Sequence, residues 1–363
     1  MNKNLIVALA ASCMTLMTAG AQTQLTTYQP GITAEGMVYY LPKTAVRVSV
    51  LVEKTTYTPG DFCRYAQRYL RVSDVSEEPS VAYRVISIDQ QAVPVADNKK
   101  VYSVKYNTKS IAANATLSDD GRLLGINTPV ADDVETPAAF QQAQKEELPN
   151  PRLFLTEEIL ACGSTAKMAE LTAREIYDLR ENRNLLIKGQ ADFMPQDGKQ
   201  MELMLAQLDR QDRSLTSLFC GTTVRDTTEH VVFVTPDGAF SRRVLFRLSQ
   251  IHGFTDADDL SGTPFYVSID DLNSAPPVDQ EALAAAKPKK KAPESGIYVN
   301  VPGSMQAVIY DGITPVSTAT HPAPQFGHVE LLSGELFNKR YTTHLWLDPL
   351  TGAVMKLESD PVK

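Results

Sequence analysis

Alternating valines between Val46 and Val52 constrain the fold of this chain more than any other feature of its sequence. Valine occupies every second position there, with arginine, serine and leucine between. Successive side chains of a strand point to opposite faces, so this period predicts a strand with one buried face. Residues 37–41, 81–88 and 102–106 show similar patterns. The N-terminal third is therefore predicted to form a sheet.

Turn signals divide the rest of the strand pattern. Asp120-Gly121 and Asp237-Gly238 are typical of hairpin turns, because an Asp-Gly pair readily adopts the positive φ that such turns need. Strands are expected in the C-terminal part at residues 231–235, 244–248, 296–309 and 343–357, the last divided by a turn at 348–352. The sequence thus predicts strands at both ends of the chain.

Helical patterns occur in two places. Thr58 and Pro59 can start a helix at 59–70, where aromatic and apolar residues then follow on one stripe. Between residues 164 and 220, two helices of about 33 Å each are expected, with leucine and methionine along a common seam. Two equal helices joined by a short loop are typical of an antiparallel hairpin.

These elements predict an α+β fold of two β-rich, sandwich-like domains with a long antiparallel helical hairpin between them. The N-terminal domain is expected at 22–126, a connecting segment at 127–163, the hairpin at 164–220 and the C-terminal domain at 221–363. Within the last domain, residues 274–295 combine prolines, an alanine run and clustered lysines. This composition predicts a disordered linker whose lysines form a solvated loop.

The N-terminus has the three parts of a signal peptide: one positive charge, a short apolar run and small residues before a cleavage site. Cleavage is expected between Ala21 and Gln22, which makes residues 1–21 the signal peptide. The apolar run of about 13 residues is shorter than the roughly 20 that a helix needs to span a bilayer. The alternatives are a buried N-terminal helix and lipid attachment at Cys13. The sequence predicts export.

Charge and hydropathy exclude two classes of partner. The chain has 35 basic and 43 acidic residues, a net charge of −8. Such a surface repels phosphate backbones, so nucleic-acid binding is not expected. No segment after the N-terminus approaches 18 consecutive apolar residues, so no membrane-spanning helix is expected.

Cysteines bracket the expected hairpin. Cys162 precedes its first helix and Cys220 ends its second, which would bring the two together. In an oxidising compartment a disulfide closing this loop of about 58 residues would contribute about 4 kcal/mol in the chain-entropy model. Buried free cysteines are the alternative. Cys63 would remain a lone thiol, buried rather than reactive.

Candidate chemistry is sparse. Ser164 and Lys167 fit the Ser-x-x-Lys pattern of acyl-transfer enzymes, but the partner triplets Lys-Thr-Gly and Ser-Asp-Asn are absent, and helix capping explains the serine. Zinc could be considered at His321, His328, His344, Glu330 and Glu335, whose spacing matches no ligand pattern. Calcium could be considered at Asp256, Asp258, Asp259, Asp270 and Asp271, which lack the spacing of a calcium loop. No catalytic residue, cofactor or metal ligand is assigned.

Several segments together resemble one protein family. Residues Lys54–Leu70 are similar to the N-terminal signature of an uncharacterised family of exported Bacteroidetes envelope proteins, a domain of unknown function. Ala173–Arg180, Leu208–Arg210, Pro324–Gly327 and Leu347–Gly352 resemble the same family. The resemblance covers nearly the whole chain after the signal peptide. It implies an exported module in a Gram-negative envelope and implies no activity.

The predicted function is a non-enzymatic binding or structural component of the cell envelope, in the periplasm or on the cell surface, with a protein or glycan partner. One alternative is an envelope hydrolase acting on glycan or peptide through a carboxylate pair such as Glu330 and Glu335. Another is a carbohydrate- or lipid-binding module, which would need an exposed aromatic platform built from Tyr39, Tyr40, Tyr298 or Trp346.

Overall fold

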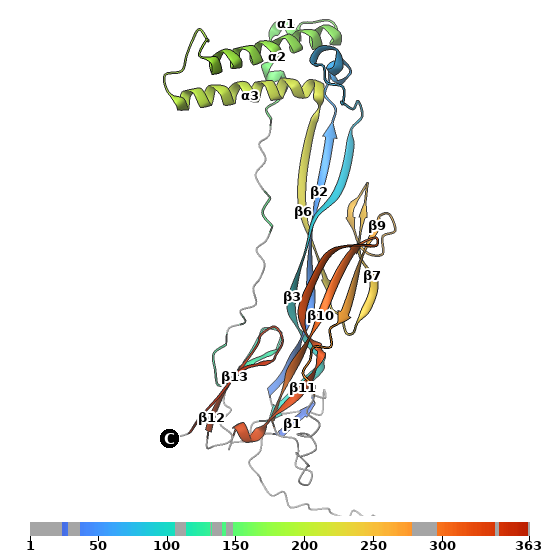
Figure 1. Cartoon of the computed structure of the whole chain (residues 1–363), viewed down its shortest axis with the longest axis vertical. Helices are drawn as coiled ribbons and strands as arrows, with labels where there is room; N and C mark the ends of the chain where they lie inside the picture. Colours follow the sequence, from blue (N-terminus) through green and yellow to red (C-terminus); the bar gives the residue numbers. More distant parts are fainter. Residues whose placement is uncertain are drawn as a thin grey trace, which may run out of the picture.

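The computed structural model describes residues 24–27, 37–105, 114–130, 132, 140–142, 148–277, 296–337 and 341–361. The chain is mostly β, with 50% of it in strands and 24% in helices. Its strands form three antiparallel sheets in an elongated molecule, and the long helices lie across one end (Figure 1).

The first sheet has the strand order β1-β3-β2-β6. Its strands are β1 (Gln24–Thr27), β2 (Met37–Thr58), β3 (Ser80–Lys105) and β6 (Thr222–Val234). At about 3.3 Å per residue, the 22 residues of β2 span about 70 Å. The valines at 46, 48, 50 and 52 are all buried, as their alternation predicted, and Ser49 and Glu53 on the opposite face are buried as well. Register shifts at Tyr40/Pro42 and Leu51/Val52 interrupt the pairing of β2 with β3.

A second sheet packs against the first. Its order is β11-β10-β9-β7-β8, formed by β7 (Phe240–Ser249), β8 (Gly253–Thr255), β9 (Thr263–Asp271), β10 (Gly296–Asp311) and β11 (Thr314–Ser333). The buried valines of β2 meet Phe246, Phe265 and Met305 in one hydrophobic core between the sheets. Apolar side chains on a single face of each sheet explain why the two sheets associate.

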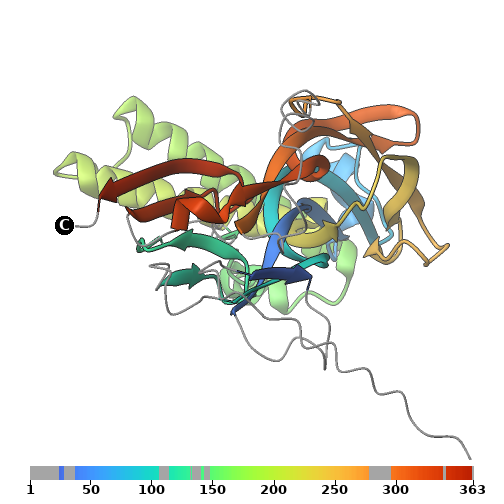
Figure 2. The same cartoon turned by 90° about the horizontal axis from the view of Figure 1, so that it is seen from below.

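A third, smaller sheet lies beside the far end of β2. Its order is β13-β12-β5-β4, formed by β4 (Ala115–Leu117), β5 (Leu123–Ile126), β12 (Tyr341–Leu347) and β13 (Val354–Pro361). Figure 2 shows the green strands β4 and β5 beside the dark red strands β12 and β13. Leu123 and Leu345 share a second core with Tyr39 and Leu41 of β2. The 3-10 turn η4 (Gly334–Phe337) adds Phe337 to this core.

Helices gather at the opposite end of β2. They are η1 (Cys63–Tyr65), η2 (Ala66–Leu70), η3 (Pro151–Phe154), α1 (Glu157–Leu160), α2 (Thr165–Lys188) and α3 (Gly198–Cys220). Phe62, Ile176 and Phe219 belong to the third core, which this group encloses. The segment 127–163, expected as a connection, therefore contributes η3 and α1.

The predicted α+β fold, with two sandwich-like domains and a long helical hairpin between them, is wrong. β2 pairs with β6, and β5 pairs with β12, so strands from both ends of the chain share sheets. The helices do not separate two β-domains, because they lie beyond one end of the first sheet (Figure 1). The physical reason is that β2 carries buried side chains from Tyr39 to Val52, and strands from the C-terminal part cover them.

Local predictions had mixed outcomes. The turn at Gly121 joins β4 to β5 with φ 81°, and the turn at 348–352 joins β12 to β13, so both hairpins are confirmed. The hairpin expected at Asp237-Gly238 is wrong: β6 pairs with β2, and β7 pairs with β9. Lys43 and Lys99 hold Asp237 against β2 and β3 at 2.9 and 2.8 Å. The turn therefore carries the chain from one sheet to the other.

The helix expected at 59–70 is reduced to η1 and η2. The backbone N–H of Phe62 donates to the carbonyl oxygen of Leu218 at 2.7 Å, and Gly60 packs directly on the carbonyls of Ser217 and Leu218. The first residues of the segment are therefore held by hydrogen bonding and close packing against α3. Regular helical hydrogen bonding does not start at residue 59 for this reason.

Several predictions fall outside the described residues: the signal peptide at 1–21, cleavage between Ala21 and Gln22, lipid attachment at Cys13, and residues 278–295 of the linker. Across the part of the chain that is described, no helix combines the length and apolarity that a membrane span needs.

Candidate functional site

α2 and α3, called here the helical pair, are anchored in the third core at one end only. Ala173 and Ile176 of α2 are buried against Leu215 and Phe219 of α3. Phe62 completes this packing, with its ring centroid 5.4 Å from that of Phe219. Farther along the pair Leu186 is also buried, but it belongs to none of the three cores. Among the described residues, no third layer packs on the far end of the helical pair.

Side-chain caps define where both helices begin. The Ser164 hydroxyl accepts a hydrogen bond from the Lys167 backbone N–H at 3.3 Å, and Asp197 accepts one from Gln200 N–H at 2.7 Å. The Lys167 ammonium pairs with Glu170 at 2.8 Å. Ser164 and Lys167 thus act as a cap and an ion-pair partner, so their Ser-x-x-Lys spacing has a structural explanation.

Two ion pairs cross between the helices. Arg180 Nε lies 3.0 Å from Asp212 Oδ1, and Arg183 Nε lies 2.6 Å from Asp209 Oδ1. Arg180 also donates to the Thr216 hydroxyl at 3.2 Å. Partly exposed pairs of this kind contribute about 0–1 kcal/mol each. Their main effect is to set how the two helices align.

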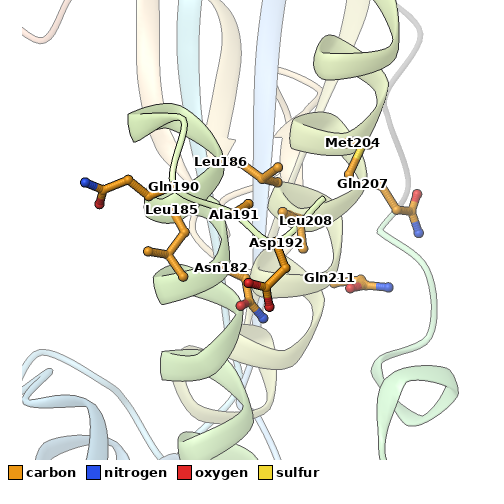
Figure 3. Close-up of a pocket in the computed structure, with 10 residues that line it drawn as sticks. All are labelled: Asn182, Leu185, Leu186, Gln190, Ala191, Asp192, Met204, Gln207, Leu208 and Gln211. Atoms are coloured by element: carbon orange, nitrogen blue, oxygen red, sulfur yellow. The ribbon is translucent and has the colours of Figure 1, made fainter. Parts of the chain in front are cut away.

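A groove of about 500 Å³ opens between the helices toward their free end (Figure 3). Its apolar lining comes from Leu185, Leu186, Met204 and Leu208. Amide side chains complete the lining at Asn182, Gln190, Gln207 and Gln211, and Asp192 is the only carboxylate in it. The groove thus offers an apolar surface with many hydrogen-bonding groups and little charge.

Large apolar side chains are also exposed at this free end. Phe193 and Leu203 are 61% and 65% exposed, and Ile187 and Met194 are exposed as well. They occupy the last turn of α2, the loop at 189–197 and the start of α3. Large exposed apolar side chains concentrated at one end of a fold are typical of an interaction site. Together with the groove it is the candidate functional site, called here the helical tip.

The three described cysteines, Cys63, Cys162 and Cys220, are free thiols, so the predicted bridge between Cys162 and Cys220 is not formed. The alignment set by the ion pairs places Cys220 level with Thr172, about 10 Å along α2 from its start. Cys162 precedes that start and donates to the Glu158 carbonyl oxygen at 3.2 Å. Burial raises the pKa of the Cys220 thiol.

The histidines considered for zinc are not brought together. His321 is buried, His328 lies 3.3 Å from Glu330, and His344 Nδ1 lies 2.7 Å from the Asn127 carbonyl oxygen. The Glu335 side chain lies outside those described. Within the described ranges, no three His, Cys, Asp or Glu side chains form a group that could hold a metal ion.

The acidic residues considered for calcium close local turns. Asp259 accepts a hydrogen bond from Ser261 N–H at 2.9 Å, and Asp271 accepts one from Asn273 N–H at 2.8 Å. These bonds account for the position of the two carboxylates, one in the loop after β8 and one at the end of β9.

The aromatic residues considered for a binding platform lie in different environments. Tyr39 is fully buried, and its hydroxyl accepts a hydrogen bond from Tyr298 N–H at 2.9 Å. Trp346 lies in the third sheet with the Lys356 ammonium 5.0 Å from its ring centre. Tyr40 packs against the turn at Gly121. The four aromatic residues do not form a common exposed surface.

Comparison with known proteins gives a family. A family model described as a domain of unknown function, DUF4831, matches residues 35–355. The chain belongs to the DUF4831 family. No curated protein and no solved structure matches the chain. The DUF4831 match confirms the expected membership of a domain of unknown function, and it includes the whole helical pair with its groove.

Sequence reasoning on this DUF4831 chain missed the helical tip. The seam of Met201, Leu208 and Leu215 predicted that the two helices pack on each other. Such a seam does not show which part of the helical pair is covered by a third element and which part stays exposed. One local signal was available: Phe193 and Met194 stand together in a loop that is otherwise small and polar. Large apolar residues in such a loop have no core to enter.

Proposed function

We propose that this protein is an exported, non-enzymatic component of a bacterial cell envelope that binds a partner protein at the helical tip. The observation that carries the proposal is the groove of about 500 Å³ with exposed Phe193 and Leu203 beside it. Export is supported by the signal-peptide pattern of residues 1–21.

The lining of the groove fits a protein segment that carries apolar anchors. Leucine and methionine side chains adapt to apolar partners of varied shape, and methionine is common at such surfaces. Amide side chains can donate to and accept from a peptide backbone. The binding mode that suits these groups is an amphipathic helix or short peptide laid between α2 and α3.

The rest of the molecule holds the helical tip away from the smaller sheet. β2 runs for about 70 Å from the third sheet to the helices. A partner bound at the tip is therefore far from the surface of β12 and β13. This arrangement suits a protein that connects two components.

Partner capture by matched variants tests the proposal. Phe193→Ser with Leu203→Ser removes exposed apolar surface at the tip without touching a core, because both side chains are mostly exposed. Ile251→Ser with Leu260→Ser removes similar exposed surface from the loops around β8. Tagged wild-type and variant proteins are used to recover partners from envelope extracts, which are quantified by mass spectrometry.

We expect the wild-type protein and the Ile251/Leu260 variant to recover the same partners and the tip variant to lose them. Photo-crosslinking from position 203 in cells should join the same partner to the helical tip. Equal recovery by all three proteins would overturn the proposal. Recovery of glycan or lipid instead of protein, lost in the same variant, would replace the protein partner by that ligand.

A further inference from the structure

β13 forms an open edge of the third sheet. Among the described strands it pairs only with β12, and all eight of its residues are exposed. Its C-terminal end projects from the side of the molecule in both views (Figures 1 and 2). An edge strand offers a row of backbone N–H and C=O groups to another strand.

One face of β13 continues a buried surface. Leu357 pairs with fully buried Leu345, and Ser359 pairs with buried Thr343. Leu357 itself is 37% exposed, and Val354, which pairs with fully buried Leu347, is 39% exposed. The apolar face of the third sheet therefore extends to the open edge.

Opposite charges lie on the other face of the same strand. Lys356 Nζ is 2.7 Å from Glu358 Oε1, and the same ammonium lies over the Trp346 ring. The two charges are thus held side by side at the edge of the sheet, each within reach of an added strand.

Symmetry limits how two β13 strands can pair. A two-fold axis perpendicular to the sheet keeps every side chain on its own face, so one residue must lie opposite itself. An axis at Lys356 or at Glu358 would put like charges opposite each other, which is unfavourable. An axis at Leu357 puts Lys356 opposite Glu358 of the second copy twice, and Leu357 opposite Leu357.

We infer that two copies of this chain associate through antiparallel pairing of their β13 strands, centred on Leu357. The four-stranded third sheets of the two copies join into one continuous sheet. Leu357 of each copy covers the exposed side of the other, and the four charges form alternating pairs across the axis. This association goes beyond partner binding at the helical tip and does not depend on it.

Charge exchange tests the contact. Lys356→Glu alone and Glu358→Lys alone each place like charges across the axis, so each variant should dimerise about tenfold more weakly than the wild-type chain. In an equimolar mixture of the two variants, a mixed dimer has two glutamates on one copy and two lysines on the other. Each charged residue then lies opposite a residue of the opposite charge. The ion pair within each chain stays broken in the mixture. Restored dimerisation can therefore arise only from contact between copies.

Sedimentation velocity on the full purified chain, with each variant at up to about 100 µM, gives the measurement. We expect a wild-type dimer, weakened self-association of each single variant and restored association on mixing. A wild-type chain that stays monomeric would overturn the inference. The open edge of β13 would then be a site for a strand of another protein. Single variants that dimerise like the wild-type chain, or a mixture that does not recover, would also overturn it.

Discussion

Asn300 donates a hydrogen bond from its side-chain amide to the carbonyl oxygen of Pro42 at 2.9 Å. The same amide donates to the Thr351 carbonyl oxygen at 2.8 Å. Asn300 lies on β10, Pro42 on β2, and Thr351 in the turn between β12 and β13, so one buried side chain joins all three sheets.

Replacement of Asn300 should therefore destabilise the whole fold. Asn300→Ala leaves the carbonyls of Pro42 and Thr351 without this donor in a buried site, which should cost about 2–3 kcal/mol of unfolding free energy. Urea unfolding measures this change. Asn98→Ala, at an exposed position, is the control and should change stability little. Equal stability of the two variants would contradict the role of Asn300.

Stability should fall at mildly acidic pH because of His321. Burial lowers the pKa of His321, and its Nε2 has no hydrogen-bond partner among the described groups. The unfolded chain takes up this proton near pH 6.5 and the folded chain only at lower pH. The unfolding free energy is therefore unaffected above about pH 6.5 and declines as the pH falls below it.

His321→Leu should flatten the pH dependence between about pH 6.5 and 5, whereas His252→Leu in an exposed loop should not. Unfolding by urea at a series of pH values measures both slopes. Identical slopes for His321→Leu and the wild-type protein would show that His321 does not cause the decline.

A second pH dependence should appear in strong acid. Hydrogen bonds from Lys99 and Lys43 lower the pKa of Asp237 from 3.8 to about 2. Because the folded pKa is the lower one, the carboxylate stabilises the fold above about pH 3.8, and this contribution is lost as the pH falls toward 2. Asp237→Asn should remove that part of the acid dependence. An NMR titration of the Asp237 carboxyl group that gives an ordinary pKa would refute the prediction.

Loss of Cys162 should have little effect on stability. The structure shows a free thiol there, so Cys162→Ser should change the unfolding free energy by less than about 0.5 kcal/mol. Removal of a structural disulfide would instead cost about 2–5 kcal/mol. Unfolding of both proteins without reductant decides between the two, and peptide mapping that found a bridge between Cys162 and Cys220 would contradict the structure.

The sequence predicted local features well, but it predicted poorly which strands pair with each other. Alternating valines revealed the buried face of β2, and Asp120-Gly121 revealed the turn between β4 and β5, because both patterns depend on neighbouring residues. The pairing of β2 with β6 depends on residues more than 160 positions apart, as between Val50 and His230. A period of two shows which side of a strand is buried and does not show which strand will lie beside it.

The candidate site was predicted least well. The sequence predicted a bridge between Cys162 and Cys220, which is not formed, and it assigned no catalytic or metal-binding residue. The helical tip is exposed because the third core covers only one end of the helical pair. The end that is covered is the one beside η2 and the end of β2. A single sequence carries little information about such an absence.

β2 has a consequence for how this molecule can come apart. Its backbone passes without a break from the core around Tyr39 to the core around Val50, and its end leads directly to Phe62 in the third. A force applied at the helices therefore reaches the small sheet along one continuous strand.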